Sequence, residues 1–367
     1  LVCKAPIKAK PTKPKSKSST GIYRYGGISP IPESANPNNE TLKFYLYRYL
    51  YSSNIYLYCA ANNKELYCED KPPNYLHSVE PSNNPYQFNS DLREDEYVKN
   101  QMQDTPLLSY LLYEDGKIVI DEITPKDRFG DMFRDSSRYH SQSVAKSFIS
   151  YVAGHAICKG YIESVDSRLN DWPILQNTLY HNQKLIDVLN MAAGTQKYFN
   201  GSNKFINSNR SVTTHTVQDA LENELKGSKK SYSIYNYNNL NPNIVGSYIF
   251  YKIGADNFQQ LLDDVFKKKA RIEGDAFFLK NELAEKDDPS IWSQFYATRY
   301  DYLRIAKAML DDWQNDTCVG KYLKTIHERR IPKNGVQGTT GRVGMPRSYG
   351  GFFHTGFKGM KNRPVMS

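Results

Sequence analysis

The chain has 367 residues, of which 39% are apolar and 24% charged, with 22 Gly, 18 Pro and 29 Tyr. A chain of this size can bury one large core or two modest ones, and its composition excludes a small disulfide scaffold, a collagen and a wholly disordered protein. No apolar run approaches the ~20 residues that a helix needs to cross a bilayer, since the best two, residues 107–113 and 148–157, are short and carry Tyr or His. We therefore expect no membrane span.

The net charge of +9 is concentrated at the N-terminus. Six lysines and no acidic residue lie in residues 1–20, so the rest of the chain carries only +3. A body with so small a charge gives little electrostatic reason to expect nucleic-acid binding. We interpret the Lys/Pro/Ser-rich tail as a solvated leader or linker. If it bound a polyanion instead, deleting residues 1–20 would abolish binding and salt would weaken it steeply.

The first residues and the cysteines bear on the cellular compartment. The sequence opens Leu1-Val2-Cys3 without an initiator Met, as if an export signal had been removed. Residues 55–59 and 65–68 predict two short strands, which would place Cys59 opposite Cys68 in a hairpin. A disulfide there would indicate an oxidising compartment, and two free thiols are the alternative.

The first 120 residues predict few regular elements. Residues 21–40 are expected to be irregular and residues 72–89 to form a loop, because Gly, Pro, Ser and Asn dominate both. Residues 41–58 are unusually aromatic, and periodicity does not decide between a helix and a strand. The first clear element is a hairpin in which residues 107–113 and 117–120 pair across Glu114-Asp115-Gly116.

The strongest helix signal begins near Ser143 and continues to about Lys159, followed by Gly160 as the usual residue just past a helix end. Apolar positions recur there at helical spacing, namely Val144, Phe148, Tyr151, Val152 and His155. We expect His155 to be a core histidine.

The second half predicts helices and a late strand. Residues 185–189 indicate a buried helix that stops near Gly194, and the polar residues 195–236 indicate a long irregular crossing. Further helices are expected over residues 243–253, 258–266 and 298–310, and a strand over residues 348–354. Strands, then helices, then a late strand favour an α+β body with a helical insertion.

Ser143 and Lys146 stand three residues apart at the start of the strongest helix, so both side chains lie on one face. A serine hydroxyl becomes a useful nucleophile when a neighbouring base accepts its proton. A half-buried lysine at a helix N-terminus suits that role, because desolvation and the helix dipole both disfavour the ammonium. The free N–H groups of the first turn can help to bind an oxyanion. Taken alone, the pair is also consistent with a solvated helix start.

The residues around this pair extend the pattern. Residues 141–160, their continuation over 161–166, and residues 185–194, which end Met-Ala-Ala-Gly, resemble the active-site helix and the next two landmarks of the serine β-lactamase and penicillin-binding-protein superfamily. The resemblance is closest to the class C-like branch, which also contains esterases, D-aminopeptidases and 6-aminohexanoate-oligomer hydrolases. It covers residues 100–360 in patches and leaves residues 1–95 unmatched.

That branch carries a Tyr-x-Asn element, which Tyr237-Asn238-Asn239 matches. The overlapping Tyr235-Asn236-Tyr237 lacks Asn at its third position. The resemblance implies that Tyr237 shares the proton transfer with Lys146 and that Asn239 donates to the acyl side of the substrate. A phenol beside a lysine ammonium can act as a base and then return the proton to the leaving group. The alternative is a Tyr- and Asn-rich loop.

The family's third element is Lys-Thr-Gly or His-x-Gly on a strand that lines the site, and His354-Thr355-Gly356 matches it. The resemblance implies that these residues bind substrate, through main-chain groups, a polar side chain and a glycine that allows close approach. Family members continue through further strands and a terminal helix, whereas this sequence stops at Ser367. Two explanations stay open: the sequence ends before the natural terminus, or residues 348–355 precede a third motif that is absent.

Nothing in the sequence points to a metal or a cofactor. Five histidines show no metal-ligand spacing with one another or with Cys, namely His140, His155, His181, His215 and His327. Neither a phosphate-binding glycine loop nor a dinucleotide fingerprint is present.

The stretch before the last predicted helix resembles a structural helix start of the family. We expect Thr298 to cap that helix, and Asp301 or Arg304 to form an ion pair at its buried edge.

These patterns together predict an α+β, β-lactamase/transpeptidase-like fold, in which an antiparallel sheet is flanked by helices and a helical subdomain is inserted. We expect residues 1–40 to be a basic tail and irregular leader, 41–165 the first part of the α/β domain with the active-site helix, 166–295 the helical subdomain, and 296–367 the second part of the α/β domain.

The resemblance implies a bacterial serine hydrolase, periplasmic or secreted, that forms an acyl-enzyme at Ser143 from a carboxylic ester, an amide or a β-lactam. Its ligand would be a small-molecule or short peptide-like substrate, with no nucleic acid, membrane span, metal or cofactor. The oligomeric state is not predicted. A non-catalytic binding or scaffold protein with the same fold is the alternative, and covalent labelling of Ser143 separates the two.

Overall fold

The computed structural model describes residues 22–23, 31–32, 76–105, 107–129, 133–194, 198–199, 204–207, 210–213, 217–230, 234–279, 291, 293–333, 347–356 and 365–366. The chain divides into two compact units. The first unit includes Asn83–His140 and Tyr296–Arg304, and the second includes Tyr75–Ser82, Ser141–Phe295 and Ile305–Ser367.

The first unit is built on the predicted hairpin, which the structure confirms. Strand β5 (Ser109–Glu114) pairs antiparallel with β6 (Lys117–Ile123) across the turn at Asp115 and Gly116. The two-residue strand β4 (Asn89–Ser90) pairs parallel with β6. Four further strands and a short helix lie wholly or mostly in this unit. Strand β1 (Ile22–Tyr23) pairs with β2 (Ile31–Pro32), β7 (Arg138–His140) pairs with β12 (Phe295–Thr298), and helix α4 spans Lys126–Phe129.

Helix α3 (Glu96–Asp104) covers this small sheet. Asp95 caps the helix by accepting the backbone N–H of Val98 at 3.0 Å. The buried side chains of Val98 and Met102 pack on Ile120 of β6. The unit therefore has an apolar core of its own.

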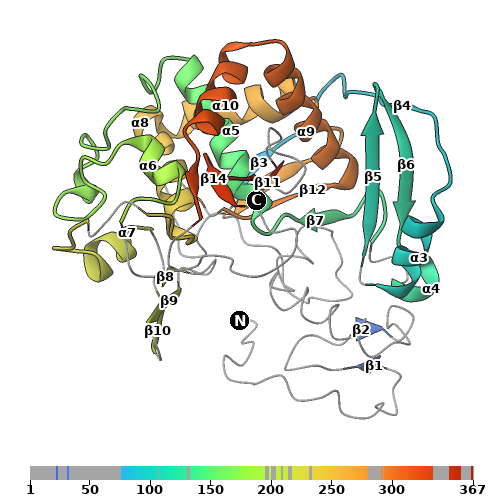
Figure 1. The fold of residues 1–367 in the computed structure, drawn as a ribbon, viewed down its shortest axis with the longest axis horizontal. Helices are drawn as coiled ribbons and strands as arrows, with labels where there is room; N and C mark the ends of the chain where they lie inside the picture. The colour runs from blue at the N-terminus through green and yellow to red at the C-terminus, as the bar shows by residue number, and fades with distance from the viewer. Residues whose placement is uncertain are drawn as a thin grey trace. The chain divides into compact units, whose positions relative to one another are not determined.

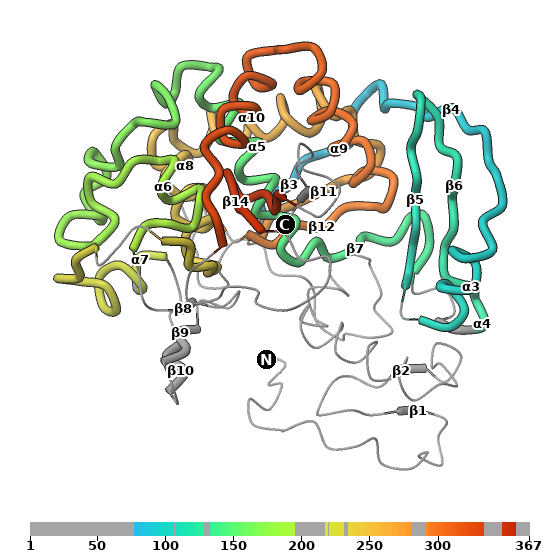
Figure 2. Tube along the Cα trace, viewed as in Figure 1, coloured from blue at the N-terminus to red at the C-terminus, as the bar shows by residue number. Residues whose placement is uncertain are grey.

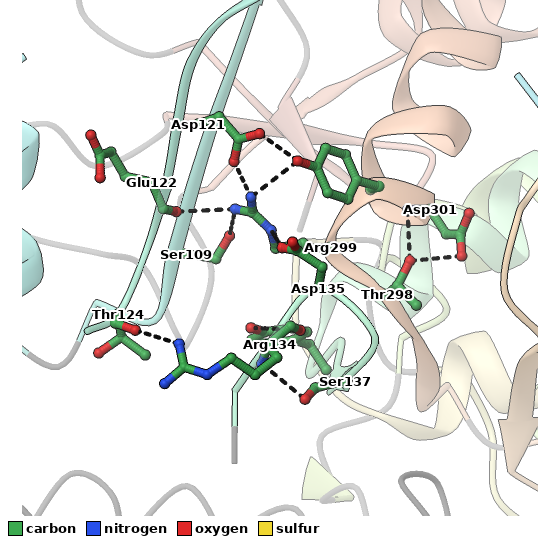
Figure 3. Close-up of polar contacts among 12 residues, drawn as sticks. Ser109, Asp121, Glu122, Thr124, Arg134, Asp135, Ser137, Thr298, Arg299 and Asp301 are labelled. Carbon is green, nitrogen blue, oxygen red and sulfur yellow. Dashed lines mark hydrogen bonds and ion pairs between the residues drawn. The ribbon is translucent and has the colours of Figure 1, made fainter. Parts of the chain in front are cut away.

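Arg299, the first residue of helix α9 (Arg299–Gln314), is buried in a polar network within the first unit (Figure 3). Its guanidinium donates to Ser109 Oγ at 2.9 Å, to the Glu122 carbonyl at 3.0 Å and to the Asp135 carboxylate at 2.7 Å, and it pairs with Asp121. A buried guanidinium is tolerated because acceptors surround it in this way.

The predicted start of this helix is confirmed. Thr298 Oγ1 accepts the backbone N–H of Asp301 at 3.2 Å and donates to its carboxylate at 2.7 Å (Figure 3). The carboxylate of Asp301 also pairs with Arg304 at 2.8 Å, and both side chains are buried. The cap and the ion pair are therefore structural.

Helix α5 (Val144–Cys158) is the central element of the second unit and confirms the strongest helix prediction. Every residue from Ala145 to Gly154 is buried, so the helix passes through the core instead of lying on its surface. Helices α8 (Leu240–Leu262) and α10 (Cys318–Glu328) pack against it. Figures 1 and 2, which are drawn from the same side, both show α10 beside α5, in agreement with the contacts between the two helices.

Helices α5 and α10 pack closely and are joined by a covalent bond. A Cβ at Gly154 would lie 2.5 Å from the Tyr322 ring, so only glycine permits this approach. Ser150 Oγ and the Tyr322 hydroxyl are 2.8 Å apart and share a hydrogen bond. A disulfide joins Cys158 to Cys318, a pairing that the sequence analysis did not identify. The considered pair, Cys59 and Cys68, lies outside the described residues.

The remaining elements of the second unit are short. They are β3 (Leu76–Val79), the 3₁₀ helix η2 (Pro173–Leu175), α6 (Leu185–Leu189), β8 (Tyr198–Phe199), β9 (Lys204–Asn207), β10 (Arg210–Thr213), α7 (Val217–Asp219), the π-helical η3 (Ala220–Glu224) and η4 (Asp263–Lys269), β11 (Ala276–Leu279), β13 (Ile331–Pro332), β14 (Ser348–Gly350), β15 (Phe353–Thr355) and β16 (Val365–Met366). All the strand pairings described in this unit are antiparallel: β3 with β11, then β10-β9-β8, and β13-β14-β15-β16.

The two helices predicted over residues 243–253 and 258–266 are found as α8 and η4. They form one continuous run with a kink at Gly254, whose φ of 75° is a backbone conformation that glycine adopts without strain. The kink explains why the apolar periodicity breaks between the two predicted segments.

Several loop predictions are wrong. The predicted loop over residues 72–89 contains β3, in which His77 and Val79 are buried and Ser78 is exposed, the alternation of a strand. The predicted irregular residues 21–40 contain β1 and β2, and the predicted irregular crossing over residues 195–236 contains β8, β9, β10, α7 and η3. Pairing between short strands gives these segments an order that their composition did not indicate.

The late strand predicted over residues 348–354 is two strands. The chain reverses at Gly351 and Phe352, whose φ values are 59° and 66°, and β14 then pairs with β15. The prediction failed because aromatic residues on both sides of the glycine pair made the segment resemble one apolar strand. None of the described helices is long and apolar enough to cross a membrane.

Candidate active site

Ser143 is the N-cap residue of α5, yet its hydroxyl makes no capping hydrogen bond. Lys146 lies on the same face, and its Nζ donates to Ser143 Oγ at 3.0 Å. Ser143 is half-buried, whereas Lys146 is only 1% exposed. No carboxylate in the described part of the chain pairs with Lys146. The serine oxygen is therefore the polar partner of a buried amine.

The turn before Ser143 is fixed to a strand end. Gln142 has a φ of 48°, a backbone conformation that residues other than glycine rarely adopt. Ser141 holds the turn on both sides, because its N–H donates to the Phe295 carbonyl at 2.8 Å and its Oγ accepts the Phe295 N–H at 3.0 Å. Strained backbone at a candidate nucleophile is consistent with a functional site.

Tyr237 completes the contacts of the serine oxygen. Its hydroxyl donates to Ser143 Oγ at 2.7 Å, and Lys146 Nζ lies 5.0 Å from the centre of its ring. Lys146 and Tyr237 thus converge on one oxygen from elements that are far apart in the sequence. The structure brings these three predicted residues together.

The loop that carries Tyr237 is held on both sides. The N–H of Asn236 donates to the Met191 carbonyl at 2.8 Å. The fully buried Asn238 donates to the Asn236 carbonyl at 3.1 Å and accepts the N–H of Asn241 at 2.9 Å. Asn238 is the middle residue of the Tyr-x-Asn element, and it had no predicted role.

His354 on β15 lies against the Tyr237 ring. The two rings are nearly parallel, with their centres 6.3 Å apart and an interplanar angle of 14°. The Tyr349 ring of β14 packs edge-on to both, at 6.0 Å from Tyr237 and 5.0 Å from His354. The third predicted motif therefore contributes a side chain that packs on Tyr237, the residue whose hydroxyl contacts Ser143.

Lys333, directly after β13, contacts His354 and was missed by sequence reasoning. Its Nζ lies 2.5 Å from His354 Nδ1. Burial lowers the pKa of Lys333 to about 8. The pKa of His354 is lowered to about 4, first by burial and then by the positive charges of Lys333 and Lys146. His354 is therefore neutral at physiological pH.

The turn between β14 and β15 is anchored to the helices behind the site. Ser147 of α5 donates through Oγ to the Phe352 carbonyl at 2.7 Å, and the Phe352 N–H donates to the Leu189 carbonyl at 3.0 Å. The Gly351 N–H donates to Asn190 Oδ1 at 2.8 Å. These bonds fix the late strands relative to the helix that carries Ser143.

Three other predicted site residues make no hydrogen bond to Ser143 in the structure as described. Asn239 is half-buried and is the N-cap residue of α8, but its side chain makes no capping bond. Thr355 is fully buried, and its Oγ1 lies 2.6 Å from Ser348 Oγ. Gly356 follows β15 directly, with a φ of 75°. Thr355 and Gly356 can contribute main-chain groups rather than side chains to a ligand.

The arrangement suits nucleophilic chemistry at one oxygen. The described residues contain no group of three or more His, Cys, Asp or Glu side chains that could hold a metal ion. The backbone N–H of Ser143 donates to no group within the described ranges, which leaves it free for an incoming oxyanion.

Comparison with solved structures identifies the fold. The structure matches a protein described as a 6-aminohexanoate-dimer hydrolase from Bacillus anthracis, with a TM-score of 0.56 and 14% sequence identity over 75% of this chain and 74% of that one. A class C β-lactamase from Rhodobacter sphaeroides matches with a TM-score of 0.37 and 15% identity, over 53% of this chain and 57% of that one. A class C β-lactamase in complex with cefoxitin matches with a TM-score of 0.44 and 13% identity, over 64% and 68%.

No protein-family model matches the chain, and no curated protein matches it significantly. At this identity the likeness shows the fold alone. The first of these matches supports the predicted β-lactamase/transpeptidase-like α+β fold.

Proposed function

We propose that the chain is a serine hydrolase that forms an acyl-enzyme at Ser143. The observation that carries the proposal is the convergence of Lys146 Nζ, at 3.0 Å, and the Tyr237 hydroxyl, at 2.7 Å, on Ser143 Oγ. A nucleophile within hydrogen-bond reach of its base is the arrangement that activates a serine. The fold likeness agrees with this chemistry without identifying the substrate.

The proton transfers follow from these two contacts. While both partners donate to Oγ, the serine keeps its own proton; once either partner is deprotonated, that contact reverses and Oγ–H donates. As Oγ forms a bond to the substrate carbonyl carbon, the proton passes to the Lys146 amine or the Tyr237 phenolate, and the carbonyl electron pair moves onto oxygen. Collapse of this oxyanion breaks the bond to the leaving nitrogen or oxygen, which takes the proton.

Water completes the reaction. It attacks the acyl carbon while the same pair accepts its proton, and the departing Ser143 Oγ then recovers a proton. The Ser143 N–H and a main-chain N–H from the late strand would hold the oxyanion in both steps. Each such donor contributes about 3 kcal/mol to lowering the barrier.

We infer that the substrate is a small or short peptide-like carboxylic ester, amide or β-lactam. Asn239, the His354 side chain and the main chain at Thr355 and Gly356 are its proposed contacts. The Cys158–Cys318 disulfide supports a periplasmic or secreted location, since disulfides persist in oxidising compartments.

Pre-steady-state hydrolysis of p-nitrophenyl butyrate tests the proposal. We expect wild-type protein to release a burst of p-nitrophenol, because an acyl-enzyme accumulates. Ser143→Ala should show neither burst nor turnover. Ser164→Ala removes a hydroxyl that accepts the Asp166 N–H at 3.1 Å, and it should behave as wild type. Equal hydrolysis by wild type and Ser143→Ala would contradict the proposal.

A further inference from the structure

We propose that Lys333 is a positioning residue that holds His354 as a neutral hydrogen-bond donor, with its proton on Nε2 and available to an acceptor atom of the substrate. This inference rests on the proposed function and assigns one substrate contact within it.

The contact between the two side chains determines the tautomer. An ammonium group carries three donors and no acceptor, so Lys333 Nζ, 2.5 Å from His354 Nδ1, must donate to that nitrogen. Nδ1 then offers its lone pair, and a neutral imidazole carries its proton on Nε2. Lys333 therefore selects one of two tautomers that the isolated ring would populate.

Lys333 is itself held in place. It is 9% exposed, and its backbone N–H donates to the Arg347 carbonyl at 2.9 Å. Its Nζ lies 5.3 Å from the centre of the Tyr235 ring and 5.7 Å from that of Tyr349, which is cation–π range. Within the described ranges no carboxylate pairs with it, and His354 is its hydrogen-bond acceptor. A buried ammonium without a counter-ion is costly and is consistent with a functional position.

The other nitrogen of the ring is open to a ligand. His354 Nε2 makes no hydrogen bond to any described group, and it is not among the buried side-chain atoms left without a partner. The ring stacks on Tyr237, whose hydroxyl contacts Ser143. The free N–H therefore belongs to a ring that adjoins the reacting groups.

The charged groups around His354 all disfavour protonation of its ring. Lys333 after β13 and Lys146 of α5 bring positive charge, and the rings of Tyr237 and Tyr349 of β14 bring phenol groups. No described carboxylate stabilises a protonated ring. These surroundings keep the imidazole neutral, so it donates a hydrogen bond through Nε2 without carrying a positive charge.

Nuclear magnetic resonance of histidine-labelled protein tests the assignment directly. We expect long-range ¹⁵N–¹H spectra to show His354, identified by its loss in His354→Asn, as the Nε2–H tautomer from about pH 5 to 7, the range in which a histidine of ordinary pKa would titrate. In Lys333→Met the pKa of His354 should rise by about one unit, and the Nδ1–H tautomer should become populated. Lys324→Met, which removes a lysine paired with Asp316, should change neither.

The substitution preserves side-chain length and removes a buried unpaired charge, so we expect it to fold. If Lys333→Met does not fold, the tautomer of His354 in the wild-type spectrum tests the inference alone. An Nδ1–H tautomer in the wild type, or an unchanged His354 in folded Lys333→Met, would overturn the inference.

The activity readout separates this inference from the proposed function. In Lys333→Met, kcat/KM for p-nitrophenyl butyrate should fall most near pH 7, because the populated Nδ1–H tautomer offers no N–H at Nε2, and the loss relative to wild type should shrink below about pH 5, where the imidazolium carries a proton on both nitrogens. A merely structural lysine would lower the rate equally at every pH, and that result would contradict the positioning role. Failure of the wild type to acylate, with the expected tautomer present, would contradict the proposed function instead.

Discussion

Removing the Tyr237 hydroxyl alone isolates its part in the proton transfer. In Tyr237→Phe the ring keeps its packing against His354 and Tyr349, and Lys146 Nζ keeps its 3.0 Å contact with Ser143 Oγ. The variant therefore loses one of two proton-transfer groups. Positioned acid–base groups contribute about 10² to 10⁴ in rate, so acylation should slow by that factor, equivalent to about 3 to 5 kcal/mol of barrier.

Stopped-flow release of p-nitrophenol measures this step, and thermal unfolding checks the fold. The lost hydrogen bond should cost about 1 kcal/mol of stability. Tyr248→Phe is a matched control, because it removes a phenol that donates to Asp171 at 2.8 Å, while Asp171 keeps its ion pair with Lys252. Near-normal acylation by a folded Tyr237→Phe would refute the assigned proton transfer, as would equal slowing in the control.

Three other changes test separate parts of the structure. Lys146→Ala should slow acylation by several orders of magnitude, since it removes the nearest amine, and stopped-flow rates close to wild type would exclude it as a base. Replacing Cys158 and Cys318 together by Ser opens a link across 160 residues and should lower the free energy of unfolding by about 2 to 5 kcal/mol in urea titrations; an unchanged midpoint would argue against the bridge. Burial lowers the pKa of His155 to about 4 in the folded protein, so the unfolded chain binds the extra proton and stability should fall as pH drops from about 6.5 to 4, by about 3 kcal/mol in full. In His155→Phe this acidic loss should be smaller, and an identical slope would show that His155 does not cause it.

Local patterns were sufficient to predict the central helix of the fold and the proximity of Ser143 to Lys146. Helix α5 was predictable because its apolar residues recur at helical spacing and Gly160 follows its end. Ser143 and Lys146 were predictable as neighbours because a helix places residues three apart on one face. Tyr237 required the resemblance, since nothing local relates it to Ser143.

The missed features depend on contacts between distant segments. Lys333 meets His354 only because β13, β14 and β15 pair in one sheet, and the predicted single strand over residues 348–354 did not allow for that turn. The Cys158–Cys318 disulfide follows from the packing of α5 on α10, which no spacing in the sequence encodes. Among the described lysines only Lys146 and Lys333 are buried, so burial rather than residue type distinguishes these two.

The most direct test of the central claim is the intact mass of the protein after exposure to a fluorophosphonate and, separately, to p-nitrophenyl butyrate, with Ser143→Ala alongside. We predict one covalent adduct per chain that is absent from Ser143→Ala. Such a result would establish a serine acyl-transfer enzyme. The absence of any adduct on folded wild-type protein, or an adduct that persists in Ser143→Ala, would contradict the claim and favour a binding protein with this fold.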